Sequence, residues 1–272
     1  MPVVEHRKVV AGKRGKSGQV QSLSRAFQLL MRLSEDEMGF TLSELASLEQ
    51  LPPSTVHRLL NSMRQLGFTE LDESRGRWSV GINAFRCGNA YLKKRDFIAQ
   101  SRAVMKRLVE QTGETSNLGV LRDAEVVFVG QVECQAVMRM VVRVGSSGPI
   151  HASGVGKALL SALPMTEALK LLGRSGMTAL TPRTLTTQAA FSEELRAIRL
   201  RGYSIDDEEQ NEGLRCIAAN VYDEFGMALA AVSISGPTVR VQQQRVAELG
   251  AQVVAAADEI THLIGGCRPE GQ

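Results

Sequence analysis

One short run of the sequence combines glycines with a lysine in the manner of an anion-binding loop. Residues 151–158 read His-Ala-Ser-Gly-Val-Gly-Lys-Ala, which superficially matches the phosphate-binding pattern G-x-x-x-x-G-K-[ST]. His151 occupies the position of the first glycine and Ala158 replaces the hydroxyl residue that would bind magnesium, so nucleotide binding is excluded. What remains is the glycine-rich start of a helix, where the free backbone amides of Gly154 and Val155 would hold a small anion such as a carboxylate.

Three further polar groups follow in the last third of the chain. The acidic run 206–209 is either a solvated loop, the commoner outcome, or it turns one carboxylate inward to accept a ligand's proton. Cys216 stands in a predicted strand, where its thiol is either an inert buried group or part of a site. Ser233 and Ser235 are two residues apart, so both hydroxyls point to one face of a predicted strand. Buried hydroxyls need partners, and a polar ligand would supply them.

A different chemistry is predicted for residues 53–66. Pro53 suits a first helical turn and Gly67 suits a left-handed helix end, which together predict a helix between them. Its apolar residues share one face: Val56, Leu59, Leu60, Met63 and Leu66. Its other face has no acidic residue and presents Ser54, Thr55, Arg58, Asn61, Ser62 and Gln65. Hydroxyl, amide and guanidinium groups match the base edges and phosphates of a major groove, so this face predicts a DNA-recognition helix rather than an ordinary solvated one.

The elements around this helix predict a winged helix-turn-helix domain over residues 21–81. An amphipathic helix is expected over 21–34, and Thr41 with Glu44 forms a capping box that begins a second, short helix. After the recognition helix, alternating residues on both sides of the turn 72–76 predict a β-hairpin. Three helices followed by a hairpin are typical of the winged fold.

The distribution of charge supports a DNA-binding N-terminal part. Residues 1–111 have a net charge of +7 and residues 112–272 a net charge of −4. Neutralisation of phosphates supplies most of the sequence-independent affinity of proteins for DNA, so the basic part is the expected DNA module. Arg75 and Arg77, at the tip of the hairpin, would lie near phosphates. Residues 1–20 are predicted to be a disordered basic arm that either lies along the DNA or is an unstructured tail.

The composition excludes several classes of protein. With 272 residues, 43% apolar and 22% charged, the chain is globular and longer than a usual single domain. No apolar run approaches the about 18 residues of a membrane helix, and the N-terminus lacks the apolar core of a secretion signal, so we expect a cytoplasmic, nucleoid-associated protein. The four cysteines are at least 47 residues apart, so no zinc clip, redox pair, metal or other cofactor is predicted.

Beyond residue 81 the sequence predicts a connecting helix and a larger α+β domain. A helix over 82–99 would bridge the two parts, and its small residues suit either pairing with a second subunit or packing on its own wing. In the domain over 100–272, strands are predicted at 117–122, 126–133, 137–142, 215–221 and 228–235, and helices at 157–163, 167–172, 190–201 and 241–264. Short polar turns at 123–124 and 223–226 imply hairpins, and therefore a mainly antiparallel sheet flanked by helices.

Several ordered motifs resemble the IclR family of bacterial transcriptional regulators. In the larger domain they are the run 151–158, the segment 202–209 with Gly213-Leu214-Arg215-Cys216, and Ser233-Ile234-Ser235-Gly236-Pro237. At the DNA end they are Gln19-Val20-Gln21-Ser22-Leu23 and Ser54-Thr55-x-His57-Arg58-Leu59-Leu60. The resemblance covers roughly residues 20–266 and is greatest for the glyoxylate-responsive branch, which includes glyoxylate-bypass and allantoin-operon repressors.

This resemblance implies a winged-helix domain, a linker helix for dimerisation and an effector domain related to the GAF and profilin-like folds. The expected DNA contacts are Ser54, Thr55, His57, Arg58, Asn61, Ser62, Arg75 and Arg77. The implied effector residues are Gly154 and Val155 for the carboxylate, Asp206 and Cys216 around the aldehyde or keto end, Ser233 and Ser235 as hydroxyls, and Met140 and Leu214 as apolar wall. Two positions depart from the family pattern, because Val155 stands where alanine is usual and Gly148 where leucine is common, which leaves room for a differently shaped 2-oxo acid.

We therefore expect a homodimer or a dimer of dimers that binds a palindromic double-stranded operator, with repression relieved by a small carboxylate such as glyoxylate or pyruvate. Activation by the same kind of ligand is an alternative. A second is a thiol-dependent enzyme that uses Cys216, for which His151 is the candidate base. A third is a nonspecific chromosome-binding protein, which would leave the acidic domain unexplained.

Overall fold

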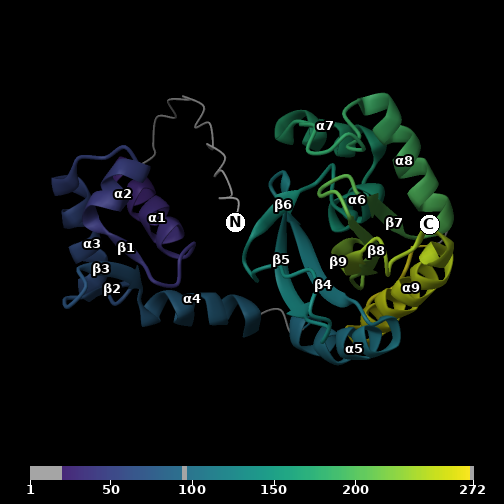
Figure 1. The fold of residues 1–272 in the computed structure, drawn as a ribbon, viewed down its shortest axis with the longest axis horizontal. Coiled ribbons are helices and arrows are strands. Elements are labelled where there is room, and N and C mark those ends of the chain that lie inside the picture. Colours follow the sequence, from purple (N-terminus) through teal and green to yellow (C-terminus); the bar gives the residue numbers. More distant parts are fainter. Residues whose placement is uncertain (1–19, 94–96, 270–272) are drawn as a thin grey trace. The chain divides into compact units, whose positions relative to one another are not determined.

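The computed structural model describes residues 20–93 and 97–269 of the chain (Figure 1). The chain forms two compact units, which divide between residues 94 and 95. The predicted basic arm lies outside the described residues except for Val20. Each unit has a sheet and an apolar core of its own.

The first unit is a winged helix-turn-helix, as the sequence predicts. It contains the helices α1 (Gln21–Leu33), α2 (Leu42–Leu48), α3 (Pro53–Gln65) and α4 (Ile82–Lys93) and the strands β1 (Phe40–Thr41), β2 (Thr69–Asp72) and β3 (Arg77–Val80). Strand β3 lies between β1 and β2 and is antiparallel to both. The two-residue strand β1 was not predicted, since two residues are too few to show alternation.

Local sequence determines where α2 and α3 begin. The Thr41 hydroxyl accepts a hydrogen bond from the Glu44 amide, and the Glu44 carboxylate accepts one from the Thr41 amide at 2.7 Å, which is the predicted capping box. Pro53 occupies the first turn of α3, where its missing N–H would have no partner within the helix. The capping box and the proline therefore fix the two helices on either side of the turn.

The helices of the first unit pack on one apolar core, which contains Leu29, Leu33, Leu45, Val56, Leu59, Leu60, Met63 and Trp78. Leu66, which was expected on the apolar face of α3, is not in the core, because this helix ends at Gln65 and Leu66 is 65% exposed. The chain then turns at Gly67, whose φ of 72° is the left-handed conformation expected of a helix end.

The predicted connecting helix over 82–99 falls partly on residues that the structure does not describe. Helix α4 ends at Lys93, and α5 (Phe97–Thr112) begins after residues 94–96, which lie outside the description. Helix α5 belongs to the second unit, where Phe97, Val104 and Leu108 are buried in the core.

The second unit is built on a six-stranded antiparallel sheet. Its strands are β4 (Thr115–Arg122), β5 (Glu125–Val132), β6 (Ser147–Pro149), β7 (Ser204–Asp207), β8 (Leu214–Tyr222) and β9 (Ala228–Pro237), in the order β6-β5-β4-β9-β8-β7. All neighbouring strands pair antiparallel. The short turns at 123–124 and 223–226 form as predicted, and the α+β class with a mainly antiparallel sheet is confirmed.

Helices cover both faces of this sheet (Figure 1). One face packs on α5 and on α9 (Val246–Leu263), which follows the short 3-10 helix η1 (Gln243–Arg245). The other face packs on α6 (Gly154–Ser161), behind which lie α7 (Met165–Ser175) and α8 (Gln188–Arg201). Two cores result, and the polar site described below lies in the α6 layer.

Two segments differ from the sequence prediction. The predicted strand at 137–142 is a loop, and the short strand β6 pairs with β5 instead, at residues 125–127. Val137 is fully exposed as a result. Conversely, the acidic segment Ser204–Asp207 is a strand, β7, although its polar composition is not typical of strands.

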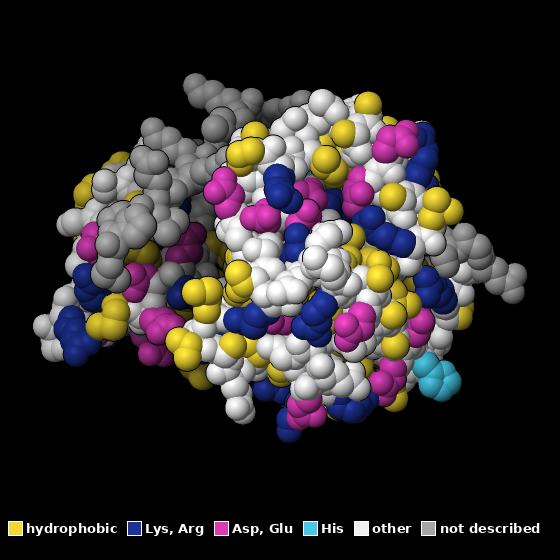
Figure 2. Space-filling model, turned by 45° about the vertical axis from the view of Figure 1, so that its right-hand side comes forward, with side chains coloured by type: hydrophobic (Ala, Val, Ile, Leu, Met, Phe, Trp, Pro, Cys, Tyr) yellow, Lys and Arg dark blue, Asp and Glu magenta, His cyan; other side chains and the backbone are white. Residues whose placement is uncertain are grey.

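Among the described residues, no helix is both long and apolar enough to cross a membrane. Within the same ranges, no group of His, Cys, Asp and Glu side chains could hold a metal ion. On the face shown in Figure 2, basic and acidic side chains are interspersed with apolar ones and do not form a patch of one sign.

Candidate effector site and DNA interface

The glycine-rich run identified in the sequence forms the start of α6. Ser153 caps the helix, and its hydroxyl accepts a hydrogen bond from the Gly156 amide at 3.1 Å. The amides of Gly154 and Val155 come earlier and have no acceptor within the helix, as is general for a first turn. A side chain at Gly154 would approach the Cys216 sulfur to 2.8 Å, so glycine is needed for helix and sheet to come this close.

Strands β7, β8 and β9 place three of the expected residues side by side. Asp206 pairs with Cys216, and Cys216 pairs with Ser235. Directly opposed residues of antiparallel strands point to the same face, and Ser233 shares this face because it is two residues from Ser235. The same face packs against α6. Asp206 is only 6% exposed, so the acidic run is not a solvated loop.

A cavity of about 220 Å³ lies between this face and the start of α6. All eight residues that the family resemblance assigns to the effector are at its wall: Gly154, Val155, Asp206, Cys216, Ser233, Ser235, Met140 and Leu214. The loop that replaces the predicted strand supplies one side through Met140, Val141, Val142 and Arg143. Asn117 and Phe128 also line the cavity and were not predicted.

Asn117 belongs to a short hydrogen-bonded chain behind the serines. The Gln131 amide donates to the Asn117 carbonyl oxygen at 2.9 Å, and the Asn117 amide donates to the Ser235 hydroxyl at 3.4 Å. Because Ser235 accepts from Asn117, its own proton points elsewhere, and the Ser235 side chain also lies close enough to Cys216 to affect the pKa of the thiol. Asn117 is 1% exposed, and its place in a predicted strand beside Leu118 is the one signal that the sequence offered.

The Ser233 hydroxyl is the unsatisfied polar group of this cavity. It is fully buried and, among the described residues, has no hydrogen-bond partner. It lies close enough to Cys216 to influence the pKa of the thiol, but not in hydrogen-bonding geometry. An unpaired buried hydroxyl costs free energy, so a polar atom in the cavity would stabilise it.

Burial raises the pKa of Asp206 to about 7, and the nearby Glu209 carboxylate adds to the rise. The backbone amides of Glu209 and Gln210 donate to Asp206 Oδ1 at 2.8 and 3.2 Å and oppose this shift, as does Lys157. Near neutral pH, Asp206 therefore exists in both protonation states. Its protonated form would be a further hydrogen-bond donor at the cavity wall.

Lys157, the lysine of the glycine-rich run, is engaged below the cavity. It is 1% exposed, donates a hydrogen bond to Glu209 and lies 3.6 Å from Glu194. Buried charges are normally paired in this way. Lys157 therefore does not present a free cation to a ligand, and it is not at the cavity wall.

The geometry does not favour a thiol-dependent enzyme. Burial, followed by the Asp206 carboxylate, raises the pKa of the Cys216 thiol to about 11, so the nucleophilic thiolate is scarce at neutral pH. His151, the candidate base, lies 3.0 Å through Nε2 from the Thr178 carbonyl oxygen and does not line the cavity.

The predicted recognition helix presents its polar face to solvent. Ser54, His57, Arg58 and Ser62 are exposed, and Thr55 and Asn61 are half-buried. The Asn61 amide donates to the His57 carbonyl oxygen at 3.0 Å, and the Ser62 hydroxyl donates to that of Arg58 at 2.9 Å. The Arg58 guanidinium makes no hydrogen bond or ion pair with any residue that the structure describes, which leaves it open to DNA.

The two wing arginines differ in setting. Arg75 is exposed at the tip of the hairpin, 3.8 Å from Asp72. Arg77 is half-buried, donates to the Gly39 carbonyl oxygen and lies 3.7 Å from Glu44. Arg77 thus ties the wing to α2 and to Gly39 before β1, whereas Arg75 is exposed beside Asp72.

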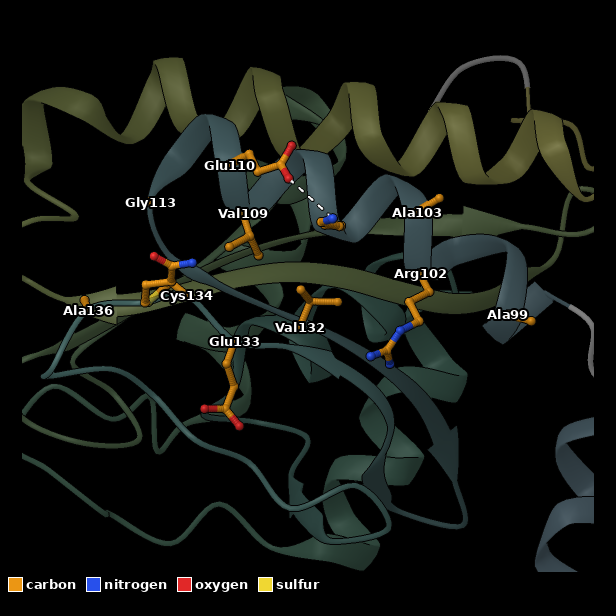
Figure 3. A pocket seen from close by; sticks show the side chains of 12 residues that line it. Ala99, Arg102, Ala103, Val109, Glu110, Gly113, Val132, Glu133, Cys134 and Ala136 are labelled. Atoms are coloured by element: carbon orange, nitrogen blue, oxygen red, sulfur yellow. Dashed lines mark ion pairs between the residues drawn. The ribbon is translucent and has the colours of Figure 1, made fainter.

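A second hollow, of about 1070 Å³, lies beside α5 (Figure 3). Its wall includes Val109 of α5 and Val132 at the end of β5, and it contains none of the predicted site residues. Two ion pairs involve its wall, Lys106 with Glu110 at 3.9 Å and Glu133 with Arg139 at 2.6 Å, and Arg102 also lines it. Nothing in it resembles the convergent donors of the smaller cavity.

Two family models match the chain, the IclR helix-turn-helix domain over residues 22–73 and the bacterial transcriptional regulator IclR C-terminal domain over residues 89–262. The chain belongs to the IclR family. The transcriptional repressor IclR of Escherichia coli is 42% identical over 270 residues, which are 98% of each chain. The repressor AllR of Escherichia coli is 35% identical over 261 residues, which are 93% of this chain and 96% of AllR.

A solved IclR homolog from Microbacterium hydrocarbonoxydans, complexed with 4-hydroxybenzoate, has the same fold, with a TM-score of 0.75 at 23% identity over 89% of this chain and 99% of the homolog. The family resemblance read from the motifs is thus confirmed. The chain is an IclR-family DNA-binding transcriptional regulator related to repressors, and the comparisons support this assignment over an enzyme.

Proposed function

We propose that this chain is a repressor whose operator binding is modulated by a small 2-oxo acid, of the glyoxylate or pyruvate type, in the 220 Å³ cavity. The observation that carries the proposal is the fully buried Ser233 hydroxyl, which lines this cavity and has no hydrogen-bond partner among the described residues. The Gly154 and Val155 amides, which have no acceptor within the helix, and the Ser235 hydroxyl line the same cavity.

Carboxylate and carbonyl oxygens are acceptors only, so an end rich in donors favours them over amines or alcohols. The amides at the start of α6 add the positive end of the helix dipole, which suits the carboxylate. The cavity is smaller than the about 300–1,000 Å³ of pockets for drug-sized ligands, which suits an acid of a few heavy atoms.

For the DNA end, we propose a homodimer, or a dimer of such dimers, that reads a palindromic operator with α3. Two exposed apolar faces in the first unit support a dimer. Helix α1 and the residue before it present Val20, Leu23, Phe27 and Met31, and α4 presents Ile82 and Phe85, each more than half exposed. Such apolar stripes are commonly covered by a partner, and a second copy would place two recognition helices on two half-sites.

Effector and operator are coupled only if the effector binds two arrangements of the dimer unequally, because equal affinity shifts no population. The relatives are named repressors, so we propose that the effector favours the arrangement that releases DNA. A regulator of this kind acts in the cytoplasm at the nucleoid.

Calorimetry with glyoxylate and pyruvate tests the cavity. The double variant Asp206→Ala with Ser233→Ala should lose binding, because it removes a wall carboxyl and the unpaired hydroxyl. Ser116→Ala is the matched control, since Ser116 is also a buried, unpartnered hydroxyl of the same sheet but does not line the cavity. Normal binding by the double variant would show that the effector lies elsewhere.

A further inference from the structure

Two bulky side chains at the cavity wall each lie against a glycine. Phe128 of β5 lies against Gly148 of β6, where a Cβ would be 3.2 Å from Cε2 of the ring. Val155 of α6 lies against Gly119 of β4, where a Cβ would be 2.8 Å from Cγ1 of Val155. The two glycines therefore provide the space that the two bulky residues occupy.

These two residues are parts of a packed wall. Phe128 is 9% exposed and Val155 is 1% exposed, and both belong to the apolar core beneath α6 together with Val126 and Ala231. Phe128 pairs directly with Gly119 across β4 and β5, so the two glycine contacts lie next to each other on the sheet. A close-packed wall yields little to a larger ligand.

Strand register separates Phe128 from the serines. Ser233 pairs with Asn117 of β4, whereas Phe128 lies on the other side of β4, opposite Gly119. The carboxylate and keto oxygens of a bound 2-oxo acid are acceptors and would lie with Ser233 and Ser235, so the remaining substituent on the keto carbon would point toward Phe128 and Val155.

We propose that Phe128 is the residue that determines effector size. Its ring occupies the space that a side chain at position 148 would fill, and it limits this substituent to a hydrogen atom or a methyl group. Val155 is the second limit. This inference rests on the proposed function, because it specifies which acids the same cavity admits.

Competition between acids of graded size tests the proposal on the full-length chain. Calorimetry would use glyoxylate, pyruvate, 2-oxobutyrate and 2-oxoisovalerate, which differ only in the substituent on the keto carbon. The unmodified chain should prefer the first two, and Phe128→Ala should improve the affinity for 2-oxoisovalerate relative to glyoxylate about tenfold or more, the effect of about one misfitted methylene in an apolar pocket. Phe128→Leu should shift the preference in the same direction by less.

Gly148→Ala provides a test in the opposite direction. Its added Cβ meets the far edge of the Phe128 ring, so the ring must move toward the cavity, and pyruvate should lose affinity relative to glyoxylate. Phe191→Leu is the control, because Phe191 is buried in the same core but does not line the cavity, so this variant should leave the preference unchanged.

The outcomes separate this inference from the proposed function. If the unmodified chain binds glyoxylate but its preference among the acids is the same in Phe128→Ala, Phe128→Leu and Gly148→Ala, the size role of Phe128 is wrong and the effector site stands. If neither the unmodified chain nor any variant binds any of the four acids, the proposed function fails and the inference fails with it.

Discussion

Asp206 lies directly opposite Cys216 across β7 and β8, at the wall of the effector cavity. Burial and this neighbouring carboxylate raise the pKa of the Cys216 thiol to about 11. The pair therefore combines a carboxyl that changes protonation near pH 7 with a thiol that stays protonated there. A protonated thiol beside such a carboxyl is not a nucleophile activated by a base.

The reactivity of the thiols tests this view of Cys216. Cys87 and Cys267 are exposed, so iodoacetamide at neutral pH should modify them first, and Cys216 should remain unmodified in the folded chain because little of it is thiolate. Mass spectrometry of peptides after timed quenching gives the order. Modification of Cys216 ahead of the two exposed cysteines would contradict the account and would revive the enzyme alternative.

Asp206 should make stability depend on pH. Its pKa in the folded chain is about 7, above the ordinary 3.8, so the folded state holds a proton that the unfolded state has already released. The resulting stabilisation is fully present below the ordinary pKa and is lost as pH rises through about 7. Asp206→Asn has no carboxyl at this position and does not lose this stabilisation. The free energy of unfolding of the variant minus that of the unmodified chain should therefore increase between about pH 5 and about pH 8.

Urea unfolding at several pH values measures this difference. Glu209 and Lys157, the charged groups around Asp206, are present in both chains, so comparing the two isolates residue 206. Asp123→Asn is the control, because Asp123 is exposed in a turn with φ of 55°, a conformation that asparagine also adopts. A relative stability that stays flat or falls toward alkaline pH would show that Asp206 is ionised in the fold.

Asn117 should matter for the effector although it was not predicted. Asn117→Ala removes the donor that orients the Ser235 hydroxyl, and we expect a loss of about 1 kcal/mol, or about fivefold in Kd, for glyoxylate or pyruvate. Asn220→Ala is the control, because the Asn220 amide is also buried in the α6 layer, where it donates to the Ala158 carbonyl oxygen away from the cavity. Equal losses in the two variants would assign the effect to general destabilisation.

Arg58 should contribute directly to DNA binding. Arg58→Ala should cost about 1–3 kcal/mol of operator affinity if the side chain reads a base, or should weaken all duplexes alike and reduce the salt dependence if it contacts a phosphate. Fluorescence anisotropy at several salt concentrations separates the two cases. Arg122→Ala, an exposed arginine of the second unit, should change neither, and an unaltered Arg58→Ala would remove this side chain from the interface.

Local features of the fold were predictable because their partners are close in sequence. The Thr41–Glu44 capping box spans three residues, and the serines at 233 and 235 share a face through the two-residue period of a strand. The family motifs supplied the remaining effector residues, which the structure brings to one cavity.

Features that depend on strand register were not predictable. Asn117 bonds to Ser235, which is 118 residues away, and only the pairing of β4 with β9 brings them together. The contact between Phe128 and Gly148 depends likewise on how β6 pairs with β5.

The most direct test of the account is whether a ligand in this cavity changes the affinity of the chain for its operator. The purified chain would first select its operator from random duplexes, and anisotropy would then follow operator binding as glyoxylate or pyruvate is added. The account predicts that the acid weakens operator binding by the unmodified chain and by Ser116→Ala, and has no effect on Asp206→Ala with Ser233→Ala, which should still bind DNA normally. The same response in the double variant as in the unmodified chain would contradict it.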